Sequence, residues 1–281
     1  MQNAYAVLLK TTADAFAESG VDTPRLDAEI LLAHTLGCER AALMVRAEAP
    51  KSVELEKFTA MVARRIEGEP VAYITGYQPF WNHDFLVNPH TLIPRQDTEA
   101  LIEVALKDLP QDGQILDLGT GSGCIMLSIL EERPSLTGLG LDISSEALEL
   151  ARRNAQNMGL KDRASFAESD WFSALPEPGK QFCGIVSNPP YIPTPDIEVL
   201  MADVRDFEPV LALDGGPDGL VPYRLIVEAA PQYLVSGGLL AVEVGVLQSN
   251  DVAAMFTAAG LNEVQITRDL PGMERVVSGK K

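Results

Sequence analysis

Residues Asp117-Leu118-Gly119-Thr120-Gly121-Ser122-Gly123 decide the fold of this 281-residue chain. The apolar run 114–118 has the length of a buried strand, and residues 124–132 have the pattern of a helix. Glycines at such a bend let the backbone approach a ligand closely, at the carboxyl edge where open α/β sheets bind their ligands. The stretch therefore predicts an α/β domain with a ligand site at this bend.

The sequence around this loop alternates between strand-like and helix-like patterns. Amphipathic stretches such as 145–158 and 248–259 separate apolar runs at 114–118, 137–142, 164–169, 182–187, 238–244 and 261–267. This alternation predicts a mostly parallel sheet covered by helices on both faces. Only the short turn Pro271-Gly272 joins the last run to 275–278, which predicts a closing hairpin with one antiparallel strand.

The N-terminal part of the chain has a different pattern. Over residues 1–75 the apolar residues recur at helical spacing, which predicts a small helical domain. Its best-marked helix is expected to begin with Thr23 as the N-cap and Pro24 as the first helical residue, and to stop at Gly37. Prolines and glycines then indicate a linker over 76–96 with a β-hairpin, before the α/β domain at 97–281.

Composition narrows the function classes. No segment approaches the roughly 20 apolar residues that a bilayer span needs, so we expect a soluble, cytoplasmic protein. The 40 acidic against 22 basic residues, a formal net charge of -18, disfavour a nucleic-acid substrate and leave a solubilising surface or a basic protein partner as alternatives. Neither the histidines nor the cysteines have metal-site spacing, and we expect buried thiols at Cys38, Cys124 and Cys183.

The glycine spacing indicates which ligand binds. The pattern is GxGxG, not the GxGxxG of a dinucleotide site, and Asp117 precedes it, which favours S-adenosylmethionine over a nucleotide. A Gly-rich turn without a ligand is the alternative. The next strand ends at Asp142, placed to bind a ribose diol, while Asp170 and Trp171 can meet the edge and face of an adenine, although Trp171 also suits a core position. The predicted cofactor residues are Asp117, Gly119, Thr120, Gly121, Ser122, Gly123, Asp142, Asp170, Trp171 and Asn188.

The tetrapeptide Asn188-Pro189-Pro190-Tyr191 follows a strand that ends at the same edge of the sheet. Two prolines stiffen the loop and leave carbonyl oxygens free to accept hydrogen bonds. The Asn188 side-chain oxygen and the Pro189 carbonyl can orient a substrate NH2 group, and Tyr191 can pack against its plane. These four residues are therefore the predicted catalytic residues; the alternative is a rigid turn.

Further motifs extend over nearly the whole chain: Glu69 to Gly76, Ile93 to Glu99, Leu116 to Ile125, Asn188 to Ile192, Phe207 to Pro209, Gly215-Gly216 with Asp218 to Leu220, and Glu243 to Gly245. With these motifs the chain resembles the HemK/PrmC family, the peptide chain release factor glutamine methyltransferases. The resemblance departs from the family at Gln96, where proline is usual, and at 246–248, where an aromatic residue is more common.

The resemblance implies a class I S-adenosylmethionine-dependent methyltransferase fold, a Rossmann-like seven-stranded sheet with a closing antiparallel hairpin. It also implies methylation of the glutamine amide nitrogen in the Gly-Gly-Gln motif of class 1 release factors, with the N-terminal helical domain recognising that partner. Three alternatives stay open at this point: a glutamine methyltransferase of a ribosomal protein, an adenine N6 methyltransferase, which the missing basic groove disfavours, and a binding module without turnover.

Overall fold

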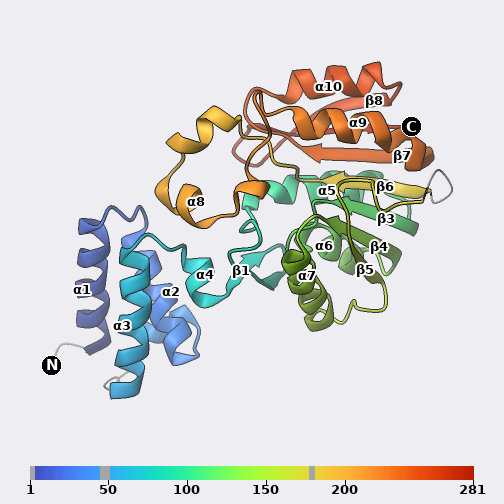
Figure 1. The fold of residues 1–281 in the computed structure, drawn as a ribbon. Coiled ribbons are helices and arrows are strands. Elements are labelled where there is room, and N and C mark those ends of the chain that lie inside the picture. The colour runs from blue at the N-terminus through green and yellow to red at the C-terminus, as the bar shows by residue number, and fades with distance from the viewer. Residues whose placement is uncertain (1–3, 45–50, 177–180) are drawn as a thin grey trace. The chain divides into compact units, whose positions relative to one another are not determined.

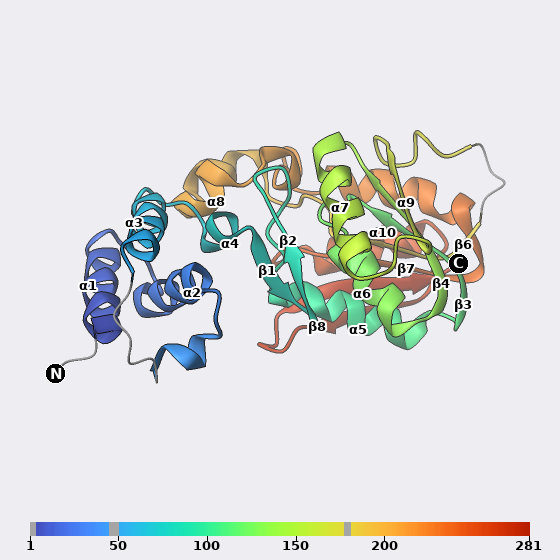
Figure 2. The same ribbon diagram turned by 90° about the horizontal axis from the view of Figure 1, so that it is seen from below.

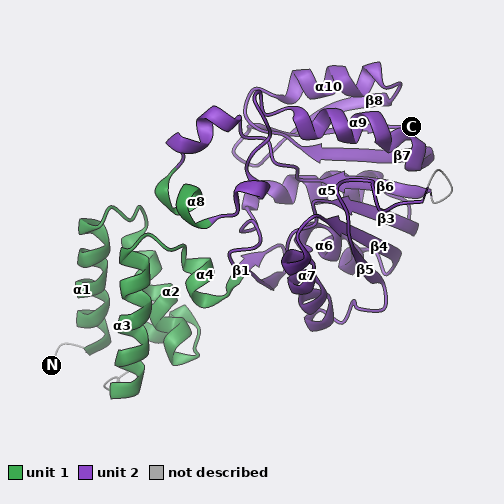
Figure 3. Cartoon of the chain, viewed as in Figure 1, with its two compact units in different colours: residues 1–77, 201–207 green, residues 78–200, 208–281 purple. Residues whose placement is uncertain are grey.

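The chain forms two compact units (Figure 3). A computed structural model describes residues 4–44, 51–176 and 181–281. The first unit comprises residues 1–77 with 201–207, and the second comprises 78–200 with 208–281. The predicted linker region contains a two-stranded hairpin of β1 (Tyr77–Phe80) and β2 (His83–Leu86).

The first unit is helical, with its own apolar core. Its helices are α1 (Ala4–Glu18), α2 (Pro24–Leu36), η1 (Arg40–Met44), α3 (Ser52–Ile66), α4 (Val71–Thr75) and α8 (Ala202–Phe207). Large side chains such as Tyr5, Phe16 and Phe58 are almost fully buried between these helices. The Arg65 Nε donates to Asp27 Oδ2 at 2.8 Å inside this core, so its one buried charge pair is compensated.

Two local predictions for the first unit need correction. Pro24 begins α2 and Gly37 ends it with a left-handed φ of 58°, as predicted, but the Thr23 hydroxyl caps no backbone N–H. It donates to Asp27 Oδ1 at 2.7 Å instead, because that carboxylate already faces the start of the helix. Cys38 is only half-buried, whereas Cys124 and Cys183 are buried as expected.

The second unit is built on a seven-stranded sheet in the order β5-β4-β3-β6-β7-β9-β8 (Figure 1). The pairs from β5 to β7 are parallel, and β9 runs antiparallel to both β7 and β8. The predicted fold class is therefore confirmed, including the closing hairpin. The strands are β3 (Asp112–Leu118), β4 (Ser135–Asp142), β5 (Ala164–Glu168), β6 (Phe182–Ser187), β7 (Leu234–Glu243), β8 (Asn262–Arg268) and β9 (Glu274–Lys280).

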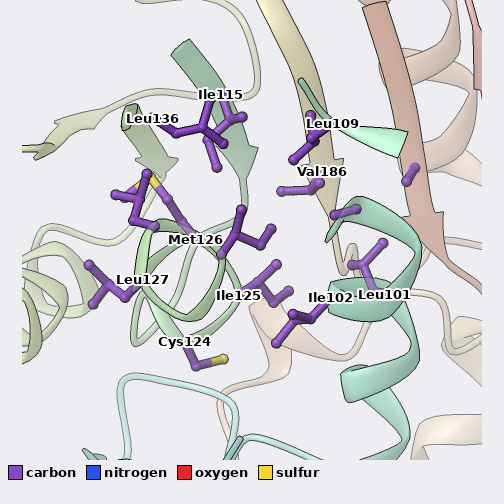
Figure 4. Close-up of a cluster of buried hydrophobic side chains, with 14 of the residues drawn as sticks. Leu101, Ile102, Leu109, Ile115, Cys124, Ile125, Met126, Leu127, Leu136 and Val186 are labelled. Atoms are coloured by element: carbon purple, nitrogen blue, oxygen red, sulfur yellow. The ribbon is translucent and has the colours of Figure 1, made fainter. Parts of the chain in front are cut away.

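Helices cover both faces of this sheet, because alternate residues of each buried strand are apolar toward opposite faces. Ile115 and Val186 pack with residues of α5 and α6 on one face (Figure 4), and Leu116 and Ile185 pack with residues of α9 and α10 on the other. Figure 2 shows the ribbons of these helices and of the sheet. The remaining helices are α5 (Glu99–Asp108), α6 (Cys124–Glu132), α7 (Ser145–Asn157), α9 (Val221–Tyr233) and α10 (Ser249–Ala258), with short turns η2 (Gln96–Thr98), η3 (Thr194–Val199) and η4 (Val210–Ala212).

The strand order places the ligand edge. From β3 the chain first proceeds outward to β4 and β5, and then returns to β6 on the other side of β3. This reversal creates a crevice at the carboxyl ends of β3 and β6, the position where open parallel sheets bind ligands. The glycine loop follows β3 and the tetrapeptide follows β6, so both motifs meet there. Of the helices in the described ranges, none has the length and apolar character to cross a membrane.

Candidate active site

A cavity of about 680 Å³ lies at this carboxyl edge, entirely within the second unit. Most of the predicted site residues line it: Gly119, Thr120, Gly121, Ser122, Asp142, Asp170, Trp171, Asn188 and Pro190. Asp117, Gly123, Pro189 and Tyr191 do not form part of its wall. The topology therefore brings the two predicted motifs to one cavity, with some members exposed to it and others supporting them.

The glycine loop is shaped by left-handed backbone and by bonds to β4. Gly119 and Gly121 have φ values of 67° and 53°, a region that favours glycine, and an added Cβ at either would meet no protein atom within 4 Å. The Thr120 N–H donates to the Leu141 carbonyl at 3.0 Å. The Gly121 N–H donates to Asp142 Oδ2 at 2.8 Å, so the end of β4 fixes the loop and leaves space beside it.

Asp142 combines a structural bond with exposure to the cavity. Its Oδ1 accepts from the Ser144 N–H at 2.9 Å and its Oδ2 from Gly121, and each oxygen keeps a second lone pair. Burial raises the pKa of this carboxyl group, while the backbone hydrogen bonds act in the opposite direction. Asp142 can therefore accept hydrogen bonds from a ligand diol without releasing the loop.

Asp117 supports the site from behind the cavity wall. It is fully buried, and Thr120 Oγ1 donates to its Oδ2 at 2.6 Å. Its Oδ1 has no hydrogen-bond partner of good geometry among the described residues. Burial raises the pKa of Asp117 to about 7. The side chain acts on the cavity through Thr120, which is a less direct position than the sequence analysis expected.

Trp171 lies on the cavity wall after β5 in an unusual backbone conformation. Its φ is 49°, which costs free energy for a bulky side chain and is held here by Ser169. The Ser169 hydroxyl donates to the Trp171 carbonyl at 2.7 Å and accepts from the Ala174 N–H at 3.0 Å. This turn places Trp171 and Asp170 on the cavity wall, where Trp171 also packs, partly buried, against the apolar core.

The tetrapeptide is held by close packing with the segment 214–219. The Ile192 N–H donates to the Leu213 carbonyl at 3.0 Å, and the Gly215 N–H donates to the Ile192 carbonyl at 2.8 Å. A Cβ on Gly215 would lie 2.8 Å from the Tyr191 Cα, so this approach requires glycine. The Gln248 Nε2 also donates to the Tyr191 carbonyl at 2.9 Å. The loop is therefore fixed along its backbone by distant segments.

Two side chains of the tetrapeptide make polar contacts. Asn188 Nδ2 donates to Thr98 Oγ1 at 3.3 Å, and Tyr191 Oη donates to Glu243 Oε1 at 3.4 Å. Glu243 is almost fully buried at the end of β7, and this burial raises its pKa to about 7. The pKa of the Tyr191 phenol is also raised, first by burial and then by the charge of Glu243.

The sequence analysis missed several residues of the wall. Arg95 is the only lysine or arginine among the described lining residues, and it pairs with the buried Glu208. Glu146 and Asp214 add two further acids to the wall, besides the predicted Asp142 and Asp170. The family-like segments Ile93 to Glu99 and Phe207 to Pro209 were the available signals for Arg95, Thr98 and Pro209. Nothing in the sequence marked the other apolar residues of the wall: Leu92, Ile143, Leu211, Val221 and Leu225.

This wall fits S-adenosylmethionine. Open space lies beside the glycine loop, acids at Asp142 and Asp170 can meet the hydroxyl and amino groups, and Trp171 offers an apolar face. Arg95 brings one positive charge, which suits the single carboxylate of the methionyl part. Within the described ranges no cluster of three or more histidine, cysteine or acidic side chains could hold a metal ion.

Comparison with known families agrees with the geometry. Residues 96–204 match the methyltransferase small domain, and residues 8–76 match the PrmC N-terminal domain. A methyltransferase from Pyrococcus furiosus of known crystal structure has the same fold, with a TM-score of 0.55 and 17% identity over 79% of this chain and 98% of that chain. The sheet order, the cavity and the domain match define an S-adenosylmethionine-dependent methyltransferase of class I.

Relatives with similar sequences narrow this class. The chain is 45% identical to the release factor glutamine methyltransferase of Rhodospirillum rubrum over 94% of this chain and 81% of the relative. It is 44% identical to that of Geobacter sulfurreducens over 97% and 95% of the two chains, and 43% identical to that of Escherichia coli over 92% and 93%. The chain therefore belongs to the release factor glutamine methyltransferase family.

Proposed function

We propose that this chain transfers a methyl group from S-adenosylmethionine to the side-chain amide nitrogen of the glutamine in the Gly-Gly-Gln motif of class 1 release factors. The observation that carries the proposal is that Asn188 lies on the wall of the same cavity as the glycine loop and Asp142. A residue suited to hold an NH2 group and residues suited to hold the cofactor thus line the same cavity.

The proposed cofactor contacts follow the cavity wall. Asp142 accepts hydrogen bonds from the ribose diol, Trp171 packs on the adenine face, and Asp170 or its backbone meets the adenine edge. When bound, S-adenosylmethionine supplies a methyl group on a sulfonium sulfur, and the transfer exchanges this S–C bond for an N–C bond. Gly119 and Gly121 approach the methionyl part, because neither carries a side chain and open space lies beside each.

The proposed acceptor contacts use the tetrapeptide. A glutamine amide is a poor nucleophile because its nitrogen lone pair is delocalised, so its orientation is the main contribution that the protein can make. The Asn188 Oδ1, on the cavity wall, and the Pro189 carbonyl each accept one N–H of the amide, and Tyr191 packs against the amide plane. Pro189 and Tyr191 lie outside the cavity wall, so their proposed contacts with the amide are made beyond it. The amide nitrogen becomes strongly acidic once methylated and then releases its proton, so we assign no general base.

We further propose that the N-terminal helical unit recognises the release factor. Residues 8–76 match the PrmC N-terminal domain, and this unit has its own core and provides no residue to the cavity wall. Such a unit is not needed to build the site, so binding of the protein substrate is a role that remains for it. The net charge of -18 favours a basic protein partner over a nucleic acid.

Transfer of labelled methyl groups tests the proposed function. The chain is incubated with labelled S-adenosylmethionine and a purified class 1 release factor, its Gly-Gly-Gln to Gly-Gly-Ala variant, or an adenine-containing oligonucleotide. We expect label on the unaltered factor alone. Label on both factors would place the acceptor at another residue. Label on the oligonucleotide, or on none of the three, would contradict the proposal and direct the search to nucleic acid or to ribosomal proteins.

A further inference from the structure

Both ends of the tetrapeptide lead to one buried carboxylate. Glu243 ends β7, and 1% of its surface is exposed. At one end of the tetrapeptide, Tyr191 Oη donates to Glu243 Oε1 at 3.4 Å. At the other end, Asn188 Nδ2 donates to Thr98 Oγ1 at 3.3 Å, and the Thr98 side chain interacts with the Glu243 carboxyl group and lowers its pKa. The Oε2 of Glu243 is buried and has no hydrogen-bond partner of good geometry among the described residues. Glu243 is thus a common anchor for the two side chains proposed to hold the substrate amide.

Thr98 is free to serve in this chain of hydrogen bonds. It occupies the N-cap position of α5, but its side chain caps no backbone N–H of that helix. A threonine hydroxyl has a single proton to donate and can accept through its lone pairs. Because Thr98 accepts from Asn188, its own proton is left to donate, and the buried Oε2 of the neighbouring Glu243 is an acceptor without another partner among the described residues.

The direction of these bonds decides which end of the Asn188 amide meets the substrate. Nδ2 is engaged by Thr98, so the acceptor Oδ1 is the atom left to bind an incoming N–H. A reversed amide would present its own N–H groups to the substrate NH2 and would repel it. An ionised carboxylate only accepts hydrogen bonds, so an ionised Glu243 requires both Thr98 and Tyr191 to donate.

We propose that Glu243 is a positioning residue for methyl transfer: through Thr98 it fixes the orientation of the Asn188 amide, and directly it fixes Tyr191. The inference rests on the proposed function, because it assumes that Asn188 holds the acceptor amide. Glu243 does not itself line the cavity, so it acts through the two residues that it orients.

The groups around Glu243 make its ionisation sensitive to pH near neutrality. Burial is the main cause that raises its pKa, to about 7, and Asp97 raises it further, whereas Thr98, Tyr191 and the positive charge of Arg275 lower it. Tyr223 Oη faces it as well and donates to the Glu243 carbonyl at 3.0 Å. Arg275 forms ion pairs with two other acids, from Nη2 to Asp97 Oδ2 at 3.2 Å and from Nε to Asp269 Oδ2 at 3.1 Å. Its positive charge is therefore divided among several carboxyl groups and does not serve Glu243 exclusively.

The test compares kcat, KM for a purified class 1 release factor, and the cofactor Kd in the full chain. We expect Glu243→Gln and Thr98→Val to lower kcat at least about 20-fold and to keep the cofactor Kd within about twofold, because the cofactor residues are unchanged. Thr98→Ser keeps the hydroxyl and should restore kcat to within about threefold of the wild type. Glu263→Gln, a charge removal on the exposed surface of β8, is the matched control and should behave as the wild type.

A pH profile separates positioning from a purely structural role. With a pKa of about 7 for Glu243, kcat of the wild type should fall about tenfold from pH 8 to pH 6, and Glu243→Gln should lose this dependence. Equal kcat values for Thr98→Val and Thr98→Ser, or an unchanged profile in Glu243→Gln, would overturn the inference. If Glu243→Gln does not fold, the kcat values of Thr98→Val and Thr98→Ser decide whether the inference holds.

The wild type in the same assay distinguishes the two proposals. A wild type that labels a ribosomal protein or an adenine instead of the release factor would contradict the proposed function. The variants would then be measured on that acceptor, which also presents an NH2 group, and equal rates there would overturn the role of Glu243. A wild type that labels no acceptor would overturn both.

Discussion

The glycine loop 119–123 and the tetrapeptide 188–191 are held in different ways. The loop is fixed by its own left-handed glycines and by hydrogen bonds to the neighbouring strand. One of these runs from the Gly121 N–H to the Asp142 side-chain Oδ2 at 2.8 Å. The tetrapeptide is fixed by side chains and glycines from distant segments, among them Gln248, Gly215 and Glu243. The cofactor half of the site is therefore encoded locally, and the acceptor half depends on the assembled sheet.

The largest expected effect tests the acceptor half. Asn188→Ala removes the oxygen that orients the acceptor nitrogen, so we expect kcat to fall about 100-fold or more with the cofactor Kd changed less than about threefold. Methyl-transfer kinetics and calorimetry of cofactor binding measure the two quantities. Asn157→Ala, at an exposed position at the end of α7, is the control. Lost cofactor binding with unchanged turnover would show that Asn188 belongs to the cofactor half of the site.

The reverse result is expected for the cofactor half. Asp142→Ala should weaken cofactor binding about 10- to 100-fold, because hydrogen bonds to a charged group contribute about 1.5–3 kcal/mol. Calorimetry measures the Kd, and thermal unfolding reports whether the loop that Asp142 holds is still folded. Asp162→Ala, at an exposed position before β5, should leave the Kd unchanged. An unchanged Kd in Asp142→Ala would remove its ribose role.

A pH experiment on stability tests the buried acid behind the loop. The folded state keeps a proton on Asp117 up to a pKa of about 7, whereas its usual value is 3.8. The stability that this group contributes is therefore present below about pH 4 and is lost as the pH rises toward 7. Without cofactor, Asp117→Asn should be about 1–3 kcal/mol more stable than the wild type at pH 8, and equal to it near pH 4.

Chemical unfolding at several pH values measures this difference. The other carboxyl groups titrate in both proteins, so their contributions to the free energy of unfolding cancel in the comparison with the wild type. A difference that is constant with pH would mean that Asp117 is already ionised in the folded protein, compensated by Thr120 and the nearby backbone.

The smallest expected effect concerns the support of the tetrapeptide. Gln248→Ala removes the bond from Gln248 Nε2 to the Tyr191 carbonyl, together with the bonds to the Gly219 carbonyl and from the Gly245 N–H. Of these only the bond to Tyr191 holds the tetrapeptide directly, so we expect kcat to fall about three- to tenfold, which corresponds to the roughly 0.5–1.5 kcal/mol of one neutral hydrogen bond. The cofactor Kd should not change. Gln265→Ala on the exposed face of β8 is the control. An effect on Kd without one on kcat would contradict the separation of the two halves.

Sequence patterns predicted the central strands well because these are buried on both faces, as β6 shows. The expected run 182–187 is β6 itself, and 124–132 is α6. One local prediction failed: the Thr23 hydroxyl donates to Asp27 Oδ1 and accepts from no backbone N–H at the start of the helix. The apolar wall residues Leu211, Val221 and Leu225 had no pattern of their own, because only the folded chain brings them together.

The sequence by itself determined the class of fold, and it located the glycine loop, Asp142 and the tetrapeptide that we propose binds the acceptor amide. These features lie within short segments, where residue type and spacing fix the backbone. Only the tertiary structure decided that Asp117 lies behind the cavity wall and that Arg95 is part of this wall. It also decided that Glu243 accepts a hydrogen bond from Tyr191 and interacts with Thr98. These contacts join residues far apart in the chain, and their energetics depend on burial, which no local pattern reports.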